Sequence, residues 1–217
     1  MRLLKPAVPR SGFIKHSEFE AICLGLPEDL QVVVRVGFTY GWRVSSEVLP
    51  LWRRQVDLDA GTLRLDSGQP KNDDGRIVYL TPKIKRMLVA QLERVRTLER
   101  QTGRVIPWVF PHLGKRLQGE RRRGFWKAWR RACVLAGLPG KLKHDLRRGA
   151  VRHTVNVGIN ERVAMTITGH RTRAVFDRYH ITSPNDLLDA ARKLSDKTTT
   201  KRDRLKHSGA VGQSRKP

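Results

Sequence analysis

The sequence predicts an α+β fold that is mainly α-helical, with a small three-stranded antiparallel sheet near its N-terminal third. Apolar residues recur at helical spacing in several stretches that begin with capping residues and end near glycine. Three short β-prone runs follow one another between turn-forming segments. With 217 residues and 39% hydrophobic content, the chain can bury one substantial core. One main domain is therefore expected.

Two helices are expected before the first candidate site residue, Arg43. Ser17, with Glu20 three positions later, forms a capping-box signal ahead of an apolar stretch. Pro27 takes the first position of a second helix, and its apolar stripe leads directly to Arg43. The segment VSSEVLPLW (44–52) predicts another helical turn or two, entered at one of its two serines.

The predicted sheet comes from three short runs, QVDL (55–58), GTLRL (61–65) and RIVYL (76–80). The tripeptide DAG separates the first two runs, and a polar loop (66–74) separates the last two. Short runs joined in this way are typical of antiparallel strands. Lys71 lies in the second loop.

Several further helices are predicted after the sheet, and the strand-like PWVFP (107–111) follows the first of them. Thr81 caps and Pro82 opens a long helix that ends near Gly103. Thr172 and Ser183 can cap two more helices. The other expected helices cover about residues 122–136, 145–157 and 161–168, each closed by a glycine.

The ends of the chain differ from its middle in composition. Residues 1–12 are expected to be flexible, and the main domain is expected to cover residues 13–194. After Leu194 the chain is polar, basic and almost without large apolar groups. Residues 195–217 are therefore expected to form a disordered tail.

The charge balance points to a polyanionic partner. The chain has 44 Lys and Arg residues against 20 Asp and Glu residues, a formal net charge of +24. Such a surface attracts nucleic acid, with binding that weakens strongly as salt rises. A merely solvated basic surface is the alternative, and an anionic membrane could also attract the chain. No apolar run reaches the 18 or so residues that a transmembrane helix needs.

Two other features bear on the cell compartment and on metals. MRLLKPAVPR (1–10) lacks the apolar core of a secretory signal. Cys23 and Cys133 lie far apart, and no HxxxH, HExxH or CxxC spacing occurs. A reducing cytoplasm is the simplest compartment, and no metal is expected.

The last third of the chain holds a set of residues that could bind and attack a phosphodiester. His144 and Arg147 are three apart and share one face at the start of a helix, where free backbone N–H groups already favour an anion. A planar guanidinium can give two charge-assisted hydrogen bonds to adjacent phosphate oxygens. Either residue alone would more often belong to a solvated basic face.

Two further residues complete this set. His170 follows Gly169, which is expected to end a helix in a left-handed conformation and to fix the position of the imidazole. Tyr179 becomes a useful nucleophile only where cations stabilise its phenolate. Capping explains the glycine equally well, and most tyrosines simply pack. Only the combination of residues indicates catalysis.

The aromatic and basic residues before this set are candidates for DNA contacts. Phe125, Trp126 and Trp129 are expected to pack in the core or against a neighbouring element rather than to stack on bases. The stretch 121–123 is a better candidate for phosphate contacts, although it could equally be solvated.

In these motifs the chain resembles the catalytic domain of the tyrosine recombinase, or phage integrase, family. The segment TYGWRVSSEVLPLW resembles the family's first arginine motif, and PKNDDGR resembles its β-hairpin lysine string with an arginine shortly after. HDLRR provides the family's H-x-x-R box, and TGHR with FDRYH provides its Gly-His and the tyrosine nine residues later. The catalytic residues that the resemblance implies are Arg43, Lys71, His144, Arg147, His170 and Tyr179.

The resemblance implies a mechanism and a role for each residue. Tyr179 would attack the scissile phosphate in line, which gives a 3′-phosphotyrosyl link and a free 5′-hydroxyl. Lys71 would protonate the leaving 5′-oxygen, and His144 would assist proton transfer at the tyrosine. Arg43 and Arg147 would hold the non-bridging oxygens in the transition state.

The resemblance also implies a role for His170, which would donate a further hydrogen bond to the phosphate. Neither a metal nor another cofactor is required. The implied fold is that of the family's catalytic domain, over about residues 12–194.

Three departures from the family pattern are visible. Glu47 lies four residues after Arg43, whereas many members have three, and Pro70 replaces the usual threonine before the hairpin lysine. Members generally carry an N-terminal helical core-binding domain, for which the residues before Arg43 leave no room. This domain is expected to be absent here, which would weaken DNA binding.

The expected function is therefore site-specific cutting and rejoining of double-stranded DNA. Two alternatives stay open: a type IB topoisomerase-like nicking and closing enzyme, and a catalytically weak DNA-binding remnant of an integrase. The resemblance implies a monomer when free, a homotetramer on DNA, and a prokaryotic, nucleoid-associated location in the cytoplasm.

Overall fold

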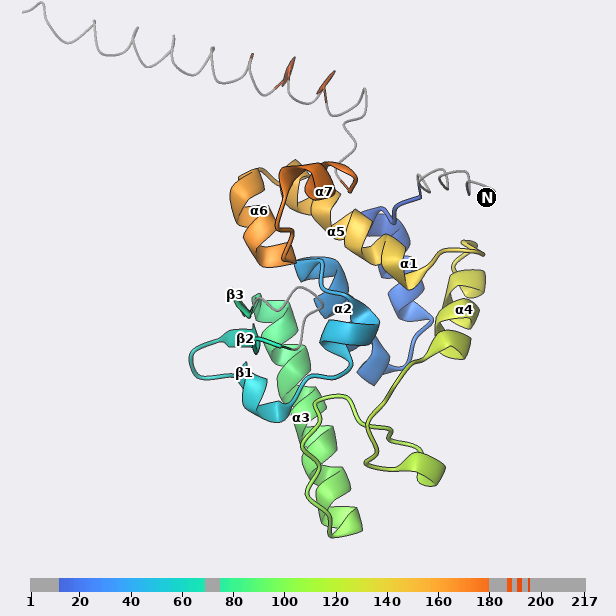
Figure 1. Ribbon diagram of the computed structural model, residues 1–217. Helices are drawn as coiled ribbons and strands as arrows, with labels where there is room; N and C mark the ends of the chain where they lie inside the picture. Colours follow the sequence, from blue (N-terminus) through green and yellow to red (C-terminus); the bar gives the residue numbers. More distant parts are fainter. Residues whose placement is uncertain (1–11, 69–74, 180–186, 189–190, 193–194, 196–217) are drawn as a thin grey trace, which may run out of the picture. The chain divides into compact units, whose positions relative to one another are not determined.

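The computed structural model describes residues 12–68, 75–179, 187–188, 191–192 and 195 (Figure 1). Internal contacts divide the chain into two units, residues 1–180 and residues 181–217. In the second unit the described residues are helical, and Ser195 Oγ donates to the Arg192 carbonyl oxygen at 2.8 Å. All elements discussed below belong to the first unit.

Helix α2 (Glu28–Tyr40) lies at the centre of the first unit, in contact with α1 (His16–Leu24), α3 (Pro82–Thr102) and α5 (Lys143–Asn156) (Figure 1). It is buried along most of its length. Two acidic residues in its first turn interact favourably with the positive end of the helix dipole. At the other end, Gly41 terminates the helix in a left-handed conformation, with φ of 66°.

The start of α1 differs from the predicted capping box. The helix begins at His16, and the Lys15 N–H donates to Glu18 Oε2 at 2.8 Å, so Ser17 does not cap it. Glu20 instead accepts from the buried guanidinium of Arg35 on α2, at 2.6 and 2.9 Å. This interhelical pair satisfies a buried charge, which is worth more than an exposed cap.

After α2 the chain makes a wide turn, the π-helical segment η1 (Val44–Val48). The Val48 N–H donates to the Arg43 carbonyl oxygen at 3.2 Å, and the Leu49 N–H donates to the Val44 carbonyl oxygen at 2.9 Å. The turn therefore begins directly after Arg43, one or two residues before the predicted entry. The 3-10 turn η2 (Arg53–Gln55) follows.

The predicted three-stranded antiparallel sheet is confirmed. Its strand order is β1-β2-β3, and Leu63 pairs with Val78 and Leu65 with Arg76. Leu63 and Val78 are buried, whereas the outward-facing Tyr79 is exposed. The strands are β1 (Val56–Asp57), β2 (Thr62–Leu65) and β3 (Arg76–Tyr79).

Helix α3 begins and ends as predicted: Thr81 Oγ1 accepts from the Ile84 N–H at 3.3 Å, and Gly103 closes the helix with φ of 65°. The strand-like run 107–111 is reduced to two isolated bridges, one between Trp108 and Trp52 and one between Pro111 and Arg121. A short 3-10 turn, η3 (Lys115–Leu117), follows.

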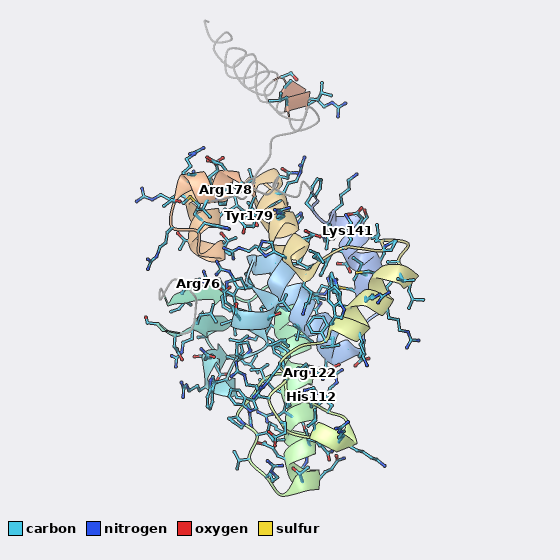
Figure 2. The ribbon with its side chains drawn as sticks, turned by 45° about the vertical axis from the view of Figure 1, so that its right-hand side comes forward. Arg76, His112, Arg122, Lys141, Arg178 and Tyr179 are labelled. Carbon is cyan, nitrogen blue, oxygen red and sulfur yellow. The ribbon has the colours of Figure 1, made fainter. Side chains whose placement is uncertain are left out.

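Helix α4 (Trp126–Leu135) begins four residues later than expected. Arg122 is held in extended chain because its Nη2 atom lies 2.6 Å from Asp29 Oδ2 (Figure 2), and Arg121 forms a bridge with Pro111. These tertiary contacts prevent residues 121–125 from joining the helix.

The last part of the first unit contains α5, α6 (Glu161–Thr168) and α7 (Arg173–Asp177). The bounds of α6 match the prediction, and Gly169 ends it with φ of 69°. Thr172 Oγ1 accepts from the Val175 N–H at 3.3 Å, as its predicted capping role requires. Ser183, the other predicted cap, lies outside the described residues.

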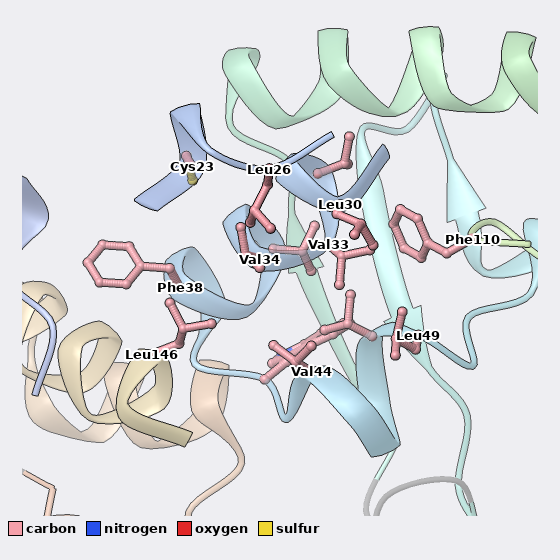
Figure 3. Packing of buried hydrophobic residues seen from close by; sticks show 14 of the residues in the cluster. Cys23, Leu26, Leu30, Val33, Val34, Phe38, Val44, Leu49, Phe110 and Leu146 are labelled. Carbon is pink, nitrogen blue, oxygen red and sulfur yellow. The ribbon is translucent and has the colours of Figure 1, made fainter. Parts of the chain in front are cut away.

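The main hydrophobic core surrounds α2, whose Leu30, Val33, Val34 and Phe38 meet side chains from several other elements (Figure 3). A smaller cluster of Val151, Ala164 and Phe176 joins α5, α6 and α7. Among the described residues, no helix combines the length and apolar content needed to cross a bilayer.

Candidate active site

Five of the six predicted site residues come together where the ends of several elements meet. Arg43 directly precedes η1, while His144 and Arg147 lie in the first two turns of α5. His170 follows α6, and Tyr179 follows α7 (Figure 2). The sixth residue, Lys71, lies outside the described residues.

Arg147 is the most buried member of this group, with 2% of its surface exposed. Its Nη1 atom donates to the carbonyl oxygens of Gly41 and, at 2.7 Å, of Thr168, and its Nη2 atom donates to His170 Nε2 at 2.9 Å. Burial, and to a lesser extent the charge of Arg43, lowers the pKa of Arg147 to about 10. The guanidinium therefore stays charged at neutral pH and is fixed in position.

The hydrogen bonds of His170 define its protonation state. A guanidinium can only donate, so Nε2 accepts from Arg147. Thr168 Oγ1 donates to the Ala164 carbonyl oxygen at 2.7 Å, and it lies 2.7 Å from His170 Nδ1, which therefore donates to it. Burial and then the charges of Arg147 and Arg43 lower the pKa of His170 to about 3. His170 is thus neutral, with its proton on Nδ1.

His144 contacts the predicted nucleophile. Its Nε2 atom lies 3.1 Å from Tyr179 Oη. Burial, followed by the charges of Arg148 and Arg147, holds the pKa of His144 below its usual range. A neutral imidazole at this distance can accept the phenol proton.

The ring of Tyr179 is held between cations and a second imidazole. The guanidinium carbons of Arg147 and Arg148 lie 5.6 and 6.0 Å from its centroid, and the His170 ring centroid lies 4.8 Å away. The fully buried Phe176 anchors α7, and its carbonyl oxygen accepts from the Tyr179 N–H at 2.8 Å. These cations favour negative charge that develops on the phenol oxygen.

Arg43 is fixed by Glu47, whose side chain is completely buried. The Arg43 N–H donates to Glu47 Oε2 at 2.7 Å, and Arg43 Nη1 donates to Oε1 at 2.6 Å. The wide turn of η1 brings the Glu47 carboxylate back to Arg43, four positions earlier. This geometry accounts for the four-residue spacing between Arg43 and Glu47. The Arg43 side chain remains 28% exposed, so it can still bind a ligand.

One residue of this cluster, Arg76, received no role in the sequence analysis. It is the first residue of β3, and its side chain is 7% exposed. Its Nη2 atom lies 2.7 Å from Glu47 Oε1, and its Nη1 atom donates to the Thr168 carbonyl oxygen at 3.2 Å. The signal was the arginine that ends PKNDDGR, but nothing local reveals that this side chain is buried.

The cluster carries a surplus of positive charge. Among the ion pairs of the described residues, Glu47 is the only carboxylate bound to Arg43, Arg76 or Arg147. One negative charge therefore faces three guanidinium groups. Such a site is electrostatically prepared for an anion.

A cavity of about 340 Å³ adjoins the cluster, with Arg43, His144 and Arg147 in its wall. Trp126 also lines this cavity and is 54% exposed, so its predicted packing role is wrong, whereas Phe125 and Trp129 are buried as predicted. Trp126, the first residue of α4, lies outside the core, whereas Trp129 in the next turn is part of it.

Lys143 forms another part of the wall, with its Nζ atom 3.4 Å from Ser45 Oγ. Burial lowers the pKa of Lys143. The described residues that line the cavity include no acidic side chain. Within the described part of the chain, no three His, Cys, Asp or Glu side chains are grouped as a metal site requires.

The sequence model of the phage integrase family matches residues 16–185. The chain belongs to this family. No curated protein matches it. The family assignment confirms the predicted resemblance, and it covers all the site residues described above as well as Lys71.

Solved structures show the same fold for this integrase-family chain. XerA recombinase has a TM-score of 0.67 at 20% identity, and the match covers 87% of the present chain and 66% of XerA. The catalytic domain of bacteriophage HP1 integrase has a TM-score of 0.55 at 21% identity, with 84% and 95% covered. These neighbours confirm the predicted catalytic fold of tyrosine recombinases.

A third neighbour is a λ integrase dimer bound to a COC′ core site, with a TM-score of 0.61 at 17% identity. The match covers 82% of the present chain and 62% of that chain. The integrase-family chain thus spans about two thirds of XerA and somewhat less of the λ integrase fragment (75–356) in that complex.

Proposed function

We propose that this chain is the catalytic domain of a site-specific DNA recombinase that cuts and rejoins strands through a 3′-phosphotyrosyl intermediate. The observation that carries the proposal is the contact between Tyr179 Oη and His144 Nε2, 3.1 Å apart, beside the buried Arg147. A nucleophile, a neutral proton acceptor and a fixed cation are thereby grouped as phosphoryl transfer requires.

In the proposed cleavage step, the phenol proton of Tyr179 passes to His144 Nε2 as Oη attacks phosphorus. A bond forms between Oη and phosphorus, and the bond from phosphorus to the 5′-oxygen breaks in line with it. Lys71 gives a proton to the departing 5′-oxygen. In the reverse direction a 5′-hydroxyl attacks the phosphotyrosine, and rejoining to a different strand gives recombination.

The guanidinium groups stabilise the charge that develops on the non-bridging oxygens. Arg43 and Arg147 both line the cavity, so one phosphate can contact both. His170 holds Arg147 in the free protein, since its Nε2 atom accepts from that residue. A bound phosphate adds negative charge and raises the pKa of His170, which then allows Nε2 to donate to the phosphate.

The proposed substrate is double-stranded DNA. A net charge of +24 and a cavity whose described lining residues include no acidic side chain favour a polyanion. One structural neighbour is XerH recombinase bound to a palindromic difH substrate in a post-cleavage complex. Assembly as a homotetramer on DNA, a monomer when free, and a nucleoid-associated location are part of the same proposal.

The test uses a library of nicked duplexes with random sequence, so no target site has to be known in advance. Cleavage next to a nick releases a short strand and traps the covalent adduct, which is separated on a denaturing gel and sequenced. Wild-type protein is expected to give the adduct, while Tyr179→Phe gives none and binds DNA nearly as well. An undiminished adduct from the variant would exclude Tyr179 as the nucleophile.

The same assay separates the other two functions. Relaxation of plasmids without any enriched site, by a monomer, would favour a topoisomerase-like enzyme. DNA binding without an adduct on any sequence would favour a remnant that no longer cuts.

A further inference from the structure

Arg76 lies between the two arginines that are proposed to hold the phosphate. Glu47 Oε1 is 2.6 Å from Arg43 Nη1 and 2.7 Å from Arg76 Nη2. The Thr168 carbonyl oxygen accepts from Arg147 Nη1 at 2.7 Å and from Arg76 Nη1 at 3.2 Å. Arg76 therefore shares an ion-pair partner, Glu47, with Arg43 and a hydrogen-bond acceptor, the Thr168 carbonyl oxygen, with Arg147.

We propose that Arg76 is a positioning residue that fixes Arg43 and Arg147 relative to each other through Glu47 and the Thr168 carbonyl group. This inference rests on the proposed function, because it assigns the two neighbours to the phosphate. Arg43 and Arg147 line the cavity beside the cluster, whereas Arg76 is not among its described lining residues. Arg76 thus acts on the phosphate through other side chains.

The fold surrounds Arg76 closely. The Trp42 ring centroid lies 5.7 Å from its guanidinium carbon, and Trp42 Nε1 donates to the Ile167 carbonyl oxygen at 3.0 Å. A Cβ atom on Gly169 would lie 1.1 Å from Arg76 Nη1. The glycine that ends α6 is therefore needed for the space that it leaves as well as for its left-handed backbone.

Arg76 also joins three separate parts of the domain. It starts β3, contacts Glu47 in η1 and binds the last carbonyl group of α6, where the helix dipole favours a cation. The strand that follows the segment containing Lys71 is thereby attached to the cluster.

Arginine suits this place better than lysine. Its planar fork directs Nη2 to Glu47 and Nη1 to Thr168 at the same time, whereas an ammonium group presents a single point of charge. Arg76→Lys keeps the positive charge but cannot reach Glu47 and Thr168 at the same time. This variant therefore distinguishes the effect of the guanidinium geometry from the effect of the charge.

The kinetic test compares Arg76→Lys and Arg76→Gln with Glu47→Gln and with the double variant Arg76→Gln/Glu47→Gln. Adduct formation at saturating DNA is expected to slow by roughly tenfold to a hundredfold in each Arg76 variant, since small displacements of catalytic groups have effects of this size. DNA affinity should change by less than about threefold, because Arg76 does not touch the DNA. The double variant should be about as slow as Glu47→Gln alone.

The matched control is Arg64→Gln on the neighbouring strand β2, where the side chain is half exposed and pairs only loosely with Asp66 at 3.4 Å. It should react at the wild-type rate. Wild-type rates in both Arg76 variants would overturn the proposal. So would multiplicative effects in the double variant, or a loss of affinity as large as the loss of rate, which would mark a direct phosphate contact.

A second measurement needs no DNA and stays informative if the proposed function fails. His170 accepts from Arg147, so its pKa, measured by histidine ¹⁵N NMR, reports the position of that guanidinium. The charge of Arg147 lowers this pKa more than the charge of Arg76 does, and Arg76→Lys keeps a positive charge at position 76, so a large rise of the His170 pKa from about 3 would show that Arg147 has moved. An unchanged His170 pKa would overturn the positioning role.

Discussion

The Oη atom of Tyr179 lies 3.1 Å from Nε2 of His144, although 35 residues separate the two in sequence. Helix α5 fixes the imidazole, and the buried Phe176 fixes the short helix that precedes the tyrosine. Burial and nearby arginines keep this imidazole neutral at physiological pH. In the proposed cleavage step, this contact places a neutral imidazole beside the phenol whose proton it accepts.

The pH dependence of adduct formation should reflect this base. His144 must be neutral to accept a proton, and its pKa is held below the ordinary value of 6.5, so the rate should stay level down to about pH 6.5 and fall only in more acidic solution. Single-turnover rates at nicked-DNA concentrations well below saturation, which report the ionisations of the free protein, would measure this. His144→Gln should be slower and should lack this acidic decline. A wild-type rate that already falls between about pH 8 and pH 7 would contradict the assignment.

Stability should depend on pH through His170. Its pKa is 6.5 in the unfolded reference and about 3 in the folded chain, so the unfolded state takes up the proton first as pH falls. This contribution to the free energy of unfolding is complete above about pH 6.5 and declines toward pH 3, by up to about 1.4 kcal/mol per pH unit. Urea unfolding at several pH values should show a shallower dependence for His170→Gln than for wild type. Parallel curves would argue against a buried neutral imidazole.

Two glycines with the same backbone conformation should differ in their tolerance of alanine. Gly103 has φ of 65° and open space where a Cβ would lie, so Gly103→Ala should cost about 1 kcal/mol for its left-handed backbone alone. Gly169 has the same left-handed conformation, with φ of 69°, but a Cβ atom added there would also displace Arg76 from Glu47. Gly169→Ala should therefore cost more than about 3 kcal/mol. Urea midpoints of the two variants provide the comparison. Equal costs would mean that Arg76 can move aside freely.

Trp126 and Trp129 lie one turn apart on α4 and should behave in opposite ways. Trp129 is fully buried, and Trp129→Ala should lose about 3–5 kcal/mol of stability. Trp126→Ala should cost less, roughly 1–2 kcal/mol, because about half of its side chain is exposed.

DNA affinity should show the reverse order. If the cavity beside Arg43 receives DNA, loss of the Trp126 ring should weaken duplex binding by roughly tenfold, which corresponds to the loss of about 1.4 kcal/mol of contact with the DNA. Fluorescence anisotropy with duplex DNA would measure it. Unchanged affinity would leave this wall of the cavity outside the DNA path.

Local signals in the sequence predicted much of the fold. Thr81, Thr172 and Gly169 act where the caps and the left-handed turn were expected, because such signals depend on a few neighbouring residues. The three β-prone runs pair as the predicted sheet, and in β2 Leu63 and Leu65 alternate onto the buried face. The mistaken cap at Ser17 arose because Glu20 has a distant partner, Arg35, that local patterns cannot reveal.

The sequence motifs predicted most residues of the candidate site, but they did not predict which side chains contact one another there. Five of the residues named from the motifs meet in space, and their roles stay predictions. Arg76 escaped notice because its partners Glu47 and Thr168 belong to other elements. Exposure of Trp126 depended on where α4 begins, which the tertiary pair between Arg122 and Asp29 determines.

Among the described residues of the cluster, one carboxylate, Glu47, contacts Arg43 and Arg76, so three guanidinium groups face one negative charge, and this has a thermodynamic consequence. Without DNA, the repulsion among Arg43, Arg76 and Arg147 opposes folding, and a phosphate bound by Arg43 and Arg147 would relieve it. Under the proposed function DNA is then a folding ligand as well as a substrate, so melting temperatures should rise with duplex concentration. Domain stability and catalytic readiness would be set by the same few charges.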